Sequence, residues 1–437
     1  MLKAGFARVD ITPPLGSVIT GYFEERRSKG ILDPLYLNAL AYGDGEKTNV
    51  LITCDATNLA AGYLNKVRAL IESETGVDKD ALFIGATHSH TAFSVNTIDP
   101  ERNPGSVFEE MLSRKFADAA KMALDDLDDA EAYTAQRETP EQISFVRRYV
   151  MRDGGIRTNP GYGNPDVLRP ISDADYTVRL VRFKRAHSPD IALLGFQTHP
   201  DVVGGEKYSA DWPGFVRRYV EKDIGGVRCV LLNGCQGDVN HINVKTPSLL
   251  PDVPKGCYDY RYSRRLGRII ADTVPDIGET GEKRPDGKVF SAVRAVSVPT
   301  NRLGAEKYEE AKAVMRDNVE NGVWYSMERL GEARRIIQLF NTPESINVPV
   351  SVQGFSDVLF VGFGGEPFSR YATEVRRAFP SSFVLTGCLT NGGEGYLPTE
   401  EAFAEGGYEA RTSRFTSALP QLIKNETFDL IKRFGLK

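Results

Sequence analysis

Short apolar segments that end abruptly in polar residues recur along this chain, and they constrain its fold more than any other feature. The clearest runs from Ala81 to Thr87 and stops at His88 and His90. Runs of this length, rich in β-branched and aromatic residues, are typical of strands buried in a sheet. Four further segments end in the same way, at Asp55, at Thr198-His199-Pro200, at Asn233-Gly234 and at Gly364-Gly365-Glu366.

Helical patterns alternate with these segments. We expect helices over residues 59–74, 108–127, 213–223, 258–274, 304–320 and 323–340. Alternating strands and helices predict an α/β fold in which a mixed β-sheet core is covered by helices. Because loops converge at strand ends in such folds, the polar residues found there predict the site.

The chain of 437 residues shows no internal repeat, low-complexity tract or Pro/Gly-rich linker. We therefore predict a single catalytic domain over residues 1–437, with a helical insertion at about 300–345. We predict no immunoglobulin-like domain at its C-terminal end.

Charge and hydropathy narrow the classes of partner. The chain has 59 acidic and 54 basic residues, a net charge of -5 and no dense basic run, which argues against a nucleic-acid partner. No stretch of 18 apolar residues and no apolar signal core appear, so we expect a cytoplasmic protein without a transmembrane segment. Five cysteines without a C-x-x-C pair predict reduced, packed thiols.

Histidines mark the predicted strand ends. The chain has five of them, and only His187 lies in an ordinary polar stretch. Side chains two residues apart on an extended chain point to the same side, so His88 and His90 can face a common point. This arrangement is suited to a metal site or to a proton-transfer pair.

Three of the residues at strand ends match the ligands of a catalytic zinc. Neutral imidazoles and a carboxylate are its commonest ligands, and His88, His199 and Glu366 supply them from separate predicted strands. Structural alternatives remain open. Each histidine can be held by backbone hydrogen bonds, and Glu366 can stabilise the N-terminus of the helix expected at Pro367.

Two further features of the loops have structural and chemical interpretations. The segment Gly237-Asp238-Val239-Asn240 is either a turn selected for its backbone shape or part of the site. Cys235 is a candidate nucleophile, but no basic residue lies near it in the sequence, which favours a packed thiol. No G-x-S-x-G nucleophile elbow is present.

Taken together, the ordered motifs resemble the catalytic domain of the neutral/alkaline non-lysosomal ceramidases, zinc amidases that cleave the N-acyl bond of ceramide. The resemblance extends over essentially the whole chain. Its motifs are Asp10-Ile11-Thr12, Gly21-Tyr22, Asp55, Thr87-His88-Ser89-His90, Thr198-His199-Pro200, Gly237-Asp238-Val239-Asn240 and Gly364-Gly365-Glu366.

By position, this resemblance implies that Zn²⁺ is held by His88, His199, Glu366 and Tyr396, with Tyr408 as the competitor for the fourth place. It also implies that His90 handles protons and that an arginine, Arg147 or its neighbour Arg148, lies at the site. Asp238 and Asn240 fall where the family binds substrate. All of these assignments follow from the matched motifs and not from spacing alone.

One departure changes the expected chemistry. The family has a serine where this chain has Asn240, which cannot replace a hydroxyl nucleophile, so water must attack. We predict a zinc-dependent amidase acting in lipid metabolism on a small N-acyl substrate other than ceramide. Two alternatives stay open: a zinc esterase or other acyl hydrolase on the same site, and an inactive ligand-binding homologue.

Overall fold

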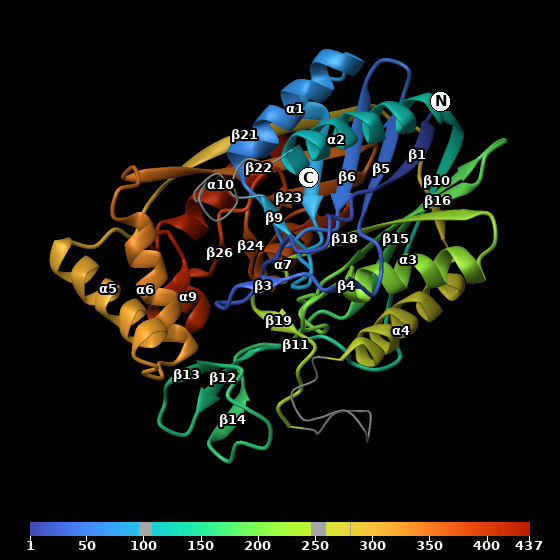
Figure 1. The fold of residues 1–437 in the computed structure, drawn as a ribbon. Coiled ribbons are helices and arrows are strands. Elements are labelled where there is room, and N and C mark those ends of the chain that lie inside the picture. Colours follow the sequence, from blue (N-terminus) through green and yellow to red (C-terminus); the bar gives the residue numbers. More distant parts are fainter. Residues whose placement is uncertain (96–106, 246–258, 280) are drawn as a thin grey trace.

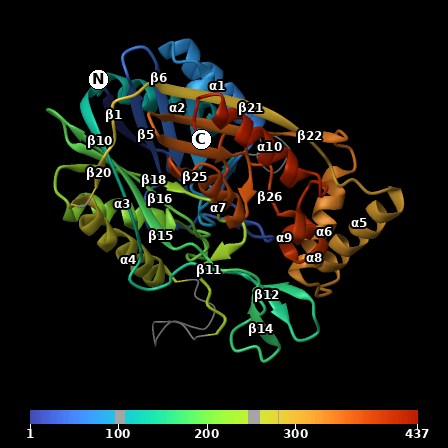
Figure 2. The same cartoon turned by 180° about the vertical axis from the view of Figure 1, so that it is seen from behind.

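Two stacked β-sheets, each covered on its outer face by helices, form the body of the protein (Figures 1 and 2). The computed structural model describes residues 1–95, 107–245, 259–279 and 281–437. The predicted α/β class, with a mixed sheet covered by helices, is confirmed. The sequence patterns indicated a sheet core but did not indicate that it consists of two sheets.

The larger sheet has nine strands, and most pairs of neighbouring strands in it are antiparallel. Parallel pairing occurs between β6 and β8 and between β16 and β18. Its order is β18 (Val227–Asn233), β16 (Asp190–Phe196), β15 (Thr177–Arg185), β10 (Asp128–Glu138), β1 (Lys3–Asp10), β5 (Tyr36–Gly43), β6 (Thr48–Cys54) and β8 (Leu82–Ala86), with β20 (Glu282–Lys283) beside β10.

The smaller sheet has four strands, and its last two, β23 and β25, are parallel. Its order is β21 (Val289–Pro299), β22 (Ser345–Phe355), β23 (Val358–Phe363) and β25 (Phe383–Gly387). The carboxyl ends of the three parallel pairs carry the loops that hold His88, His199 and Glu366. This is the place where α/β folds gather functional side chains.

Helices cover both outer faces. The larger sheet is covered by α1 (Ala61–Thr75), α2 (Val107–Asp125), α3 (Asp211–Asp223) and α4 (Tyr260–Glu279), and the smaller by α7 (Ser369–Ala378) and α10 (Leu419–Lys432). Figure 2 shows α7 and α10 on the side opposite α1 and α2. Helix α1 ends at Gly76, whose left-handed backbone (φ 74°) lets its N–H bond the carbonyl of Glu72.

A buried aromatic core lies between the sheets. It contains Phe83 from the larger sheet and Phe355 and Phe360 from the smaller one. The ring of Phe83 lies against Gly362 and Gly387, where an added Cβ would come within 2.8 and 3.0 Å of ring atoms. These two glycines therefore allow the strands β8, β23 and β25 to approach one another closely.

A helical hairpin lies beside this body. Helices α5 (Ala305–Glu320) and α6 (Met327–Leu339) pack together through Ala311, Val314, Ala333 and Ile336, within the region predicted as an insertion. The hairpin packs against α9 (Tyr408–Thr412), which follows α8 (Glu400–Glu405), through contact of Gly331 with Tyr408 and Thr412.

Short strand pairs connect the loops around the strand ends. They are β2 (Val18–Ile19) with β3 (Arg26–Arg27), β4 (Gly30–Ile31) with β17 (Lys207–Tyr208), β7 (Asn58–Leu59) with β9 (Ser94–Val95), β11 (Phe145–Val146) with β19 (Val239–Asn240), and β24 (Glu366–Pro367) with β26 (Tyr396–Leu397). A three-stranded sheet of β12 (Arg148–Met151), β13 (Ile156–Thr158) and β14 (Val167–Pro170) lies beyond them.

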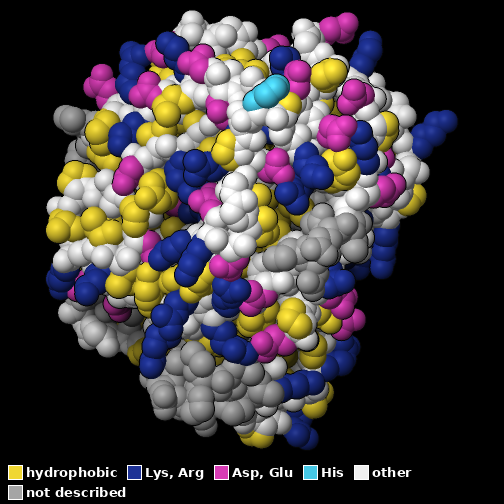
Figure 3. All heavy atoms as spheres, turned by 90° about the vertical axis from the view of Figure 1, so that its right-hand side faces the viewer, with side chains coloured by type: hydrophobic (Ala, Val, Ile, Leu, Met, Phe, Trp, Pro, Cys, Tyr) yellow, Lys and Arg dark blue, Asp and Glu magenta, His cyan; other side chains and the backbone are white. Residues whose placement is uncertain are grey.

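The surface is mixed in charge. On the face that includes α3 and α4, basic side chains are interspersed with acidic and apolar ones (Figure 3). Among the described helices, none is long and apolar enough to cross a membrane.

Candidate metal centre

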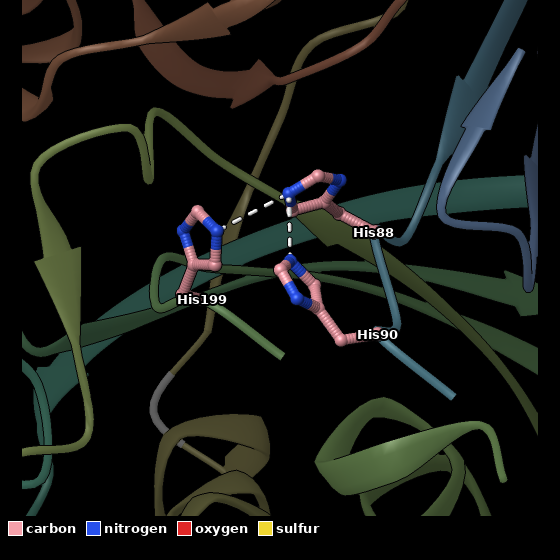
Figure 4. A group of neighbouring side chains, drawn as sticks. All are labelled: His88, His90 and His199. Atoms are coloured by element: carbon pink, nitrogen blue, oxygen red, sulfur yellow. Dashed lines mark hydrogen bonds between the residues drawn. The ribbon is translucent and has the colours of Figure 1, made fainter. Parts of the chain in front are cut away.

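Three histidines meet where the strand ends converge. The Nε2 atom of His88 lies 3.2 Å from Nε2 of His199 and 3.2 Å from Nε2 of His90 (Figure 4). The three side chains are buried, with exposed fractions of 6%, 1% and 9% in that order. Each can offer one nitrogen, and these atoms all lie within 4.8 Å of one another.

Backbone carbonyls orient two of these rings. His88 Nδ1 lies 2.6 Å from the carbonyl oxygen of Thr57, and His199 Nδ1 lies 3.3 Å from that of Gln236. A carbonyl can only accept, so each Nδ1 carries a hydrogen and each ring directs its Nε2 into the cluster. His88 also has a left-handed backbone (φ 73°), a conformation that non-glycine residues rarely adopt, directly after strand β8.

Glu366 completes the cluster from the smaller sheet. Its Oε2 atom lies 3.2 Å from Nε2 of His88 and 3.7 Å from Nε2 of His199. This oxygen is buried and makes no hydrogen bond within the described part of the chain. Lone pairs on Nε2 and Oε2 repel at this distance unless a proton or a cation lies between them.

The protonation of the cluster favours binding of a cation. Burial holds the pKa of His90 and of His199 well below the ordinary value, with further lowering by the charge of His88 and of Arg147, respectively. For His88, burial lowers the pKa, but the Glu366 carboxylate more than offsets it, so the net pKa is raised. The shifts thus favour neutral rings at His90 and His199, whereas the proton that Glu366 favours on His88 would have to leave before Nε2 could bind a metal.

The separations also fit a metal ion. Ligand atoms about 2.0–2.1 Å from a tetrahedral zinc are about 3.3–3.4 Å apart from one another. The separations among His88, His199 and Glu366, which are 3.2, 3.2 and 3.7 Å, lie close to this value. The residues present can therefore hold a divalent metal ion.

Tyr396 is aligned with Glu366. The parallel strands β24 and β26 place the two residues opposite each other in register. The Tyr396 ring lies 5.4 Å from the guanidinium carbon of Arg147 and 5.8 Å from the ring of Tyr408. Burial raises the pKa of both tyrosines, that of Tyr408 to about 12. Only Tyr396 is a register partner of Glu366.

The structure separates the two neighbouring arginines. Arg147 donates to the carbonyl of Gly237 at 2.6 Å and pairs with Glu409 at 2.8 Å, and its charge acts on Glu366 and His88. Arg148 instead bonds Glu405 and the carbonyl of Gly406. Of the two, Arg147 is therefore the arginine at the cluster.

Asp238 and Asn240, which the sequence placed at the substrate, bond other parts of the chain. Both carboxylate oxygens of Asp238 accept hydrogen bonds from Ser369 at the start of α7, at 2.6 and 3.1 Å. Burial raises the pKa of Asp238 to about 6. The Asn240 amide donates to Asn159, and its oxygen accepts from the backbone of Ile242. Their observed contacts thus hold loops in place.

Gly237, which precedes Asp238, packs directly on strand β24, which carries Glu366. A Cβ at this position would lie 2.4 Å from the carbonyl oxygen of Glu366. Only a glycine permits this close approach without moving Glu366.

Two acidic residues at the site were not predicted from the sequence. Glu409 is fully buried and, besides its pair with Arg147, accepts from Thr158 at 2.7 Å. Asp201 accepts from the Tyr22 hydroxyl at 2.5 Å, and its Oδ1 lies 3.5 Å from Nδ1 of His90. The position of Asp201 two residues after His199 was the only available hint.

The remaining candidates are not among the three clustered histidines. His241 is buried and packs on Tyr262, with ring centroids 5.7 Å apart. Cys235 is fully buried, and burial raises the pKa of its thiol to about 12, which fits the packed-thiol interpretation. Cys54, Cys229 and Cys388 are also free and buried, and Cys257 lies outside the described residues.

Comparison with known proteins identifies the fold. No protein-family model matches the chain, and no curated protein matches it. Among solved structures, neutral ceramidase from Pseudomonas aeruginosa matches with a TM-score of 0.75 and 17% identity over 99% of this chain and 75% of that chain. A ceramidase complexed with C2 matches with a TM-score of 0.72 and 17% identity over the same shares. The resemblance inferred from the motifs is therefore confirmed at the level of the fold.

Proposed function

We propose that this protein is a zinc-dependent hydrolase that cleaves the N-acyl bond of a small amide by attack of water. The observation that carries the proposal is the convergence of His88, His199 and Glu366, with donor atoms 3.2–3.7 Å apart, at the ends of parallel strands, with His90 Nε2 3.2 Å from His88. The likeness of the fold to ceramidase supports amide chemistry over other hydrolytic reactions.

The residues that would hold zinc are His88, His199, Glu366 and Tyr396, with His90 as the third imidazole in reach. When bound, zinc supplies Lewis-acid chemistry: it lowers the pKa of a water toward ~7 and polarises an acyl carbonyl. The unsatisfied Oε2 of Glu366 and the inward lone pairs of His88 and His199 supply the negative potential that retains such a cation.

The other side chains would handle protons and orient the substrate. His90 has its Nε2 atom in the cluster and the Asp201 carboxylate behind its ring, so it can take a proton and return it to the leaving amine. Arg147 is held by Glu409 and Gly237, and its positive charge can stabilise an acyl oxygen that becomes negative. Asn240 carries no hydroxyl, so it does not form an acyl-enzyme.

Residues 1–437 act in this proposal as one catalytic domain, with α5 and α6 as an insertion. The packing of the hairpin on α9, which carries Tyr408 and Glu409, supports this division. The insertion then lies beside Tyr408 and Glu409, where it can contribute to selection of the acyl or amine part of the substrate.

The test combines metal analysis with a matched substrate pair. Protein purified without a metal-binding tag should contain about one zinc per chain by plasma mass spectrometry. It should hydrolyse both an amide and an ester that share one acyl chain, with measurable turnover of the amide. His90→Ala should keep most of its metal and lose turnover, by about 10²–10⁴-fold if His90 is the general acid/base group.

Each contrary outcome has a distinct meaning. Turnover of the ester alone would replace the amidase by a zinc esterase. Ligand binding without turnover in fully metallated protein would indicate an inactive binding homologue. Absence of metal after zinc is supplied would leave the likeness to ceramidase as one of fold only.

A further inference from the structure

A small, partly open cavity lies behind the loops that carry His199 and Gln236. It has a volume of about 10 Å³ and is lined by both polar and apolar groups from β15, from the ends of β16 and β18, from β25 and from α7. This volume is close to the minimum that one water molecule requires, so any occupant must be a single small particle. Its polar lining comes chiefly from Arg179, Gln197, Arg376 and Thr386.

The charges around the cavity do not balance. Arg179 and Arg376 both pair with the same oxygen of Asp175, at 2.9 and 2.7 Å. In the described ranges, neither arginine forms an ion pair with any other carboxylate. Burial and the charge of Arg376 lower the pKa of Arg179 to about 10, so Arg179 remains cationic at neutral pH. One positive charge is left over.

The cavity also holds hydrogen-bonding groups that have no partner. Gln197 is only 3% exposed, and neither atom of its side-chain amide makes a hydrogen bond to the described residues. The buried Nε of Arg376 likewise finds no acceptor there. An unpaired buried donor is costly, which indicates that a further group completes the site.

We propose that this cavity binds one small monovalent inorganic anion, of which chloride is the physiological candidate. The anion would accept from Gln197 Nε2 and Arg376 Nε and neutralise the excess charge of the two arginines. The volume excludes phosphate, sulfate and carboxylates. A water molecule fits by size and satisfies the amide, but it leaves the positive charge uncompensated.

Bound chloride would fix the loops next to the metal cluster. Gln197 lies two residues before His199, and Gly234 of the cavity wall lies two residues before Gln236, the carbonyl partner of His199 Nδ1. The anion would therefore act as a structural brace for the His199 ring. The proposal does not depend on which reaction the protein catalyses.

The direct test is anomalous diffraction from crystals of the full chain soaked in sodium bromide, with sodium gluconate as the control salt. Bromide should give one anomalous peak inside the cavity. Density for a neutral water with no anomalous signal would overturn the proposal.

A thermal titration tests the same site in solution. At constant ionic strength, replacement of gluconate by chloride or bromide should raise the unfolding midpoint by about 1–2 °C for each tenfold increase above the dissociation constant. Sulfate should not reproduce this saturable increase. Equal stabilisation by all salts would contradict a specific site.

Matched variants locate the effect. Arg376→Gln should abolish the chloride-dependent shift, whereas Arg377→Gln, a change of the exposed neighbouring arginine, should retain it. If Arg376→Gln does not fold, Gln197→Leu disrupts the cavity in a second way while it keeps the charges of Arg179 and Arg376. Retention of the shift in both cavity variants would place the anion elsewhere.

Discussion

The two sheets contribute chemically different parts of the candidate metal centre. The larger sheet supplies the histidine side, defined as His88, His90 and His199, and the smaller sheet supplies the oxygen side, defined as Glu366 and Tyr396. Backbone carbonyls hold two rings on the histidine side, whereas Oε2 of Glu366 has no hydrogen-bond partner among the described residues. The histidine side is thus pre-oriented by its own sheet, and the oxygen side completes the site only through sheet packing.

Loss of the histidine side should have the largest effect. We expect His88→Ala/His199→Ala to reduce metal content from about one ion per chain to none and to abolish hydrolysis, because two of the inward lone pairs are lost. Plasma mass spectrometry measures this directly. His187→Ala removes a surface histidine, with an 84% exposed side chain, and should bind metal normally. Normal metal content in the double variant would move the site elsewhere.

Loss of the carboxylate should weaken binding without removing the site. Glu366→Gln keeps the shape of the side chain but removes the negative charge beside His88. Loss of a residue that only hydrogen-bonds a metal ligand typically lowers metal affinity by ~10–100-fold, and the loss of Glu366 should exceed this. Competition with a chromophoric chelator gives the affinity. The exposed Glu400→Gln serves as the control. An unchanged affinity would assign Glu366 to loop structure alone.

Variants of the two tyrosines test which of them binds the metal. Register pairing with Glu366 favours Tyr396, so Tyr396→Phe should lower metal affinity by about tenfold, and Tyr408→Phe should leave it within twofold. Chelator competition on both variants decides between them. The reverse order would assign the fourth ligand to Tyr408, and two unchanged variants would limit the oxygen side to Glu366.

A smaller effect concerns the support of the histidine side. Asp211 accepts from the backbone of Val202 and Val203, just beyond His199, and burial raises its pKa to about 6 from 3.8. The folded state therefore binds this proton more tightly than the unfolded chain does, and stability falls as pH rises from about 4 to 6.

Asp211→Asn should remove this contribution. Between pH 4 and 7, wild type should lose ~1–3 kcal/mol more of its unfolding free energy than the variant, as measured by urea denaturation. A matching pH dependence in the two proteins would show that Asp211 titrates normally in the folded state.

The sequence predicted the strands with continuous apolar runs and missed some of the strands that lack them. Strands β8, β16, β18 and β23 were predicted because both of their faces are buried, which requires such runs. Strand β10 was missed because its sequence, DDAEAYTAQRE, alternates small and polar residues. The division into two sheets could not be predicted either. A strand that is buried on both faces has the same apolar sequence pattern whether a helix or a second sheet covers it.

The candidate site was predictable to the extent that its residues end strands. His88, His199 and Glu366 directly follow apolar runs, and the structure places their donor atoms 3.2–3.7 Å apart. Glu409 follows no such run, and Asp201 lies two residues beyond His199 in the same loop. Their importance depends on burial beside Arg147 and His90, which is a property of tertiary packing and leaves no local pattern.

The contact of Phe83 with Gly362 and Gly387 has a consequence for selectivity among ions. Phe83 lies five residues before His88 on one sheet, and Gly362 lies four residues before Glu366 on the other. In the proposed metal centre, the closeness of this contact therefore contributes to the spacing of the nitrogen and oxygen donors, and with it to the ionic radius that they accommodate. A Cβ at Gly362 would lie 2.4 Å from the Thr390 side chain and 2.8 Å from the Phe83 ring, so an alanine there should spread the donors and favour larger cations without any change to a proposed ligand.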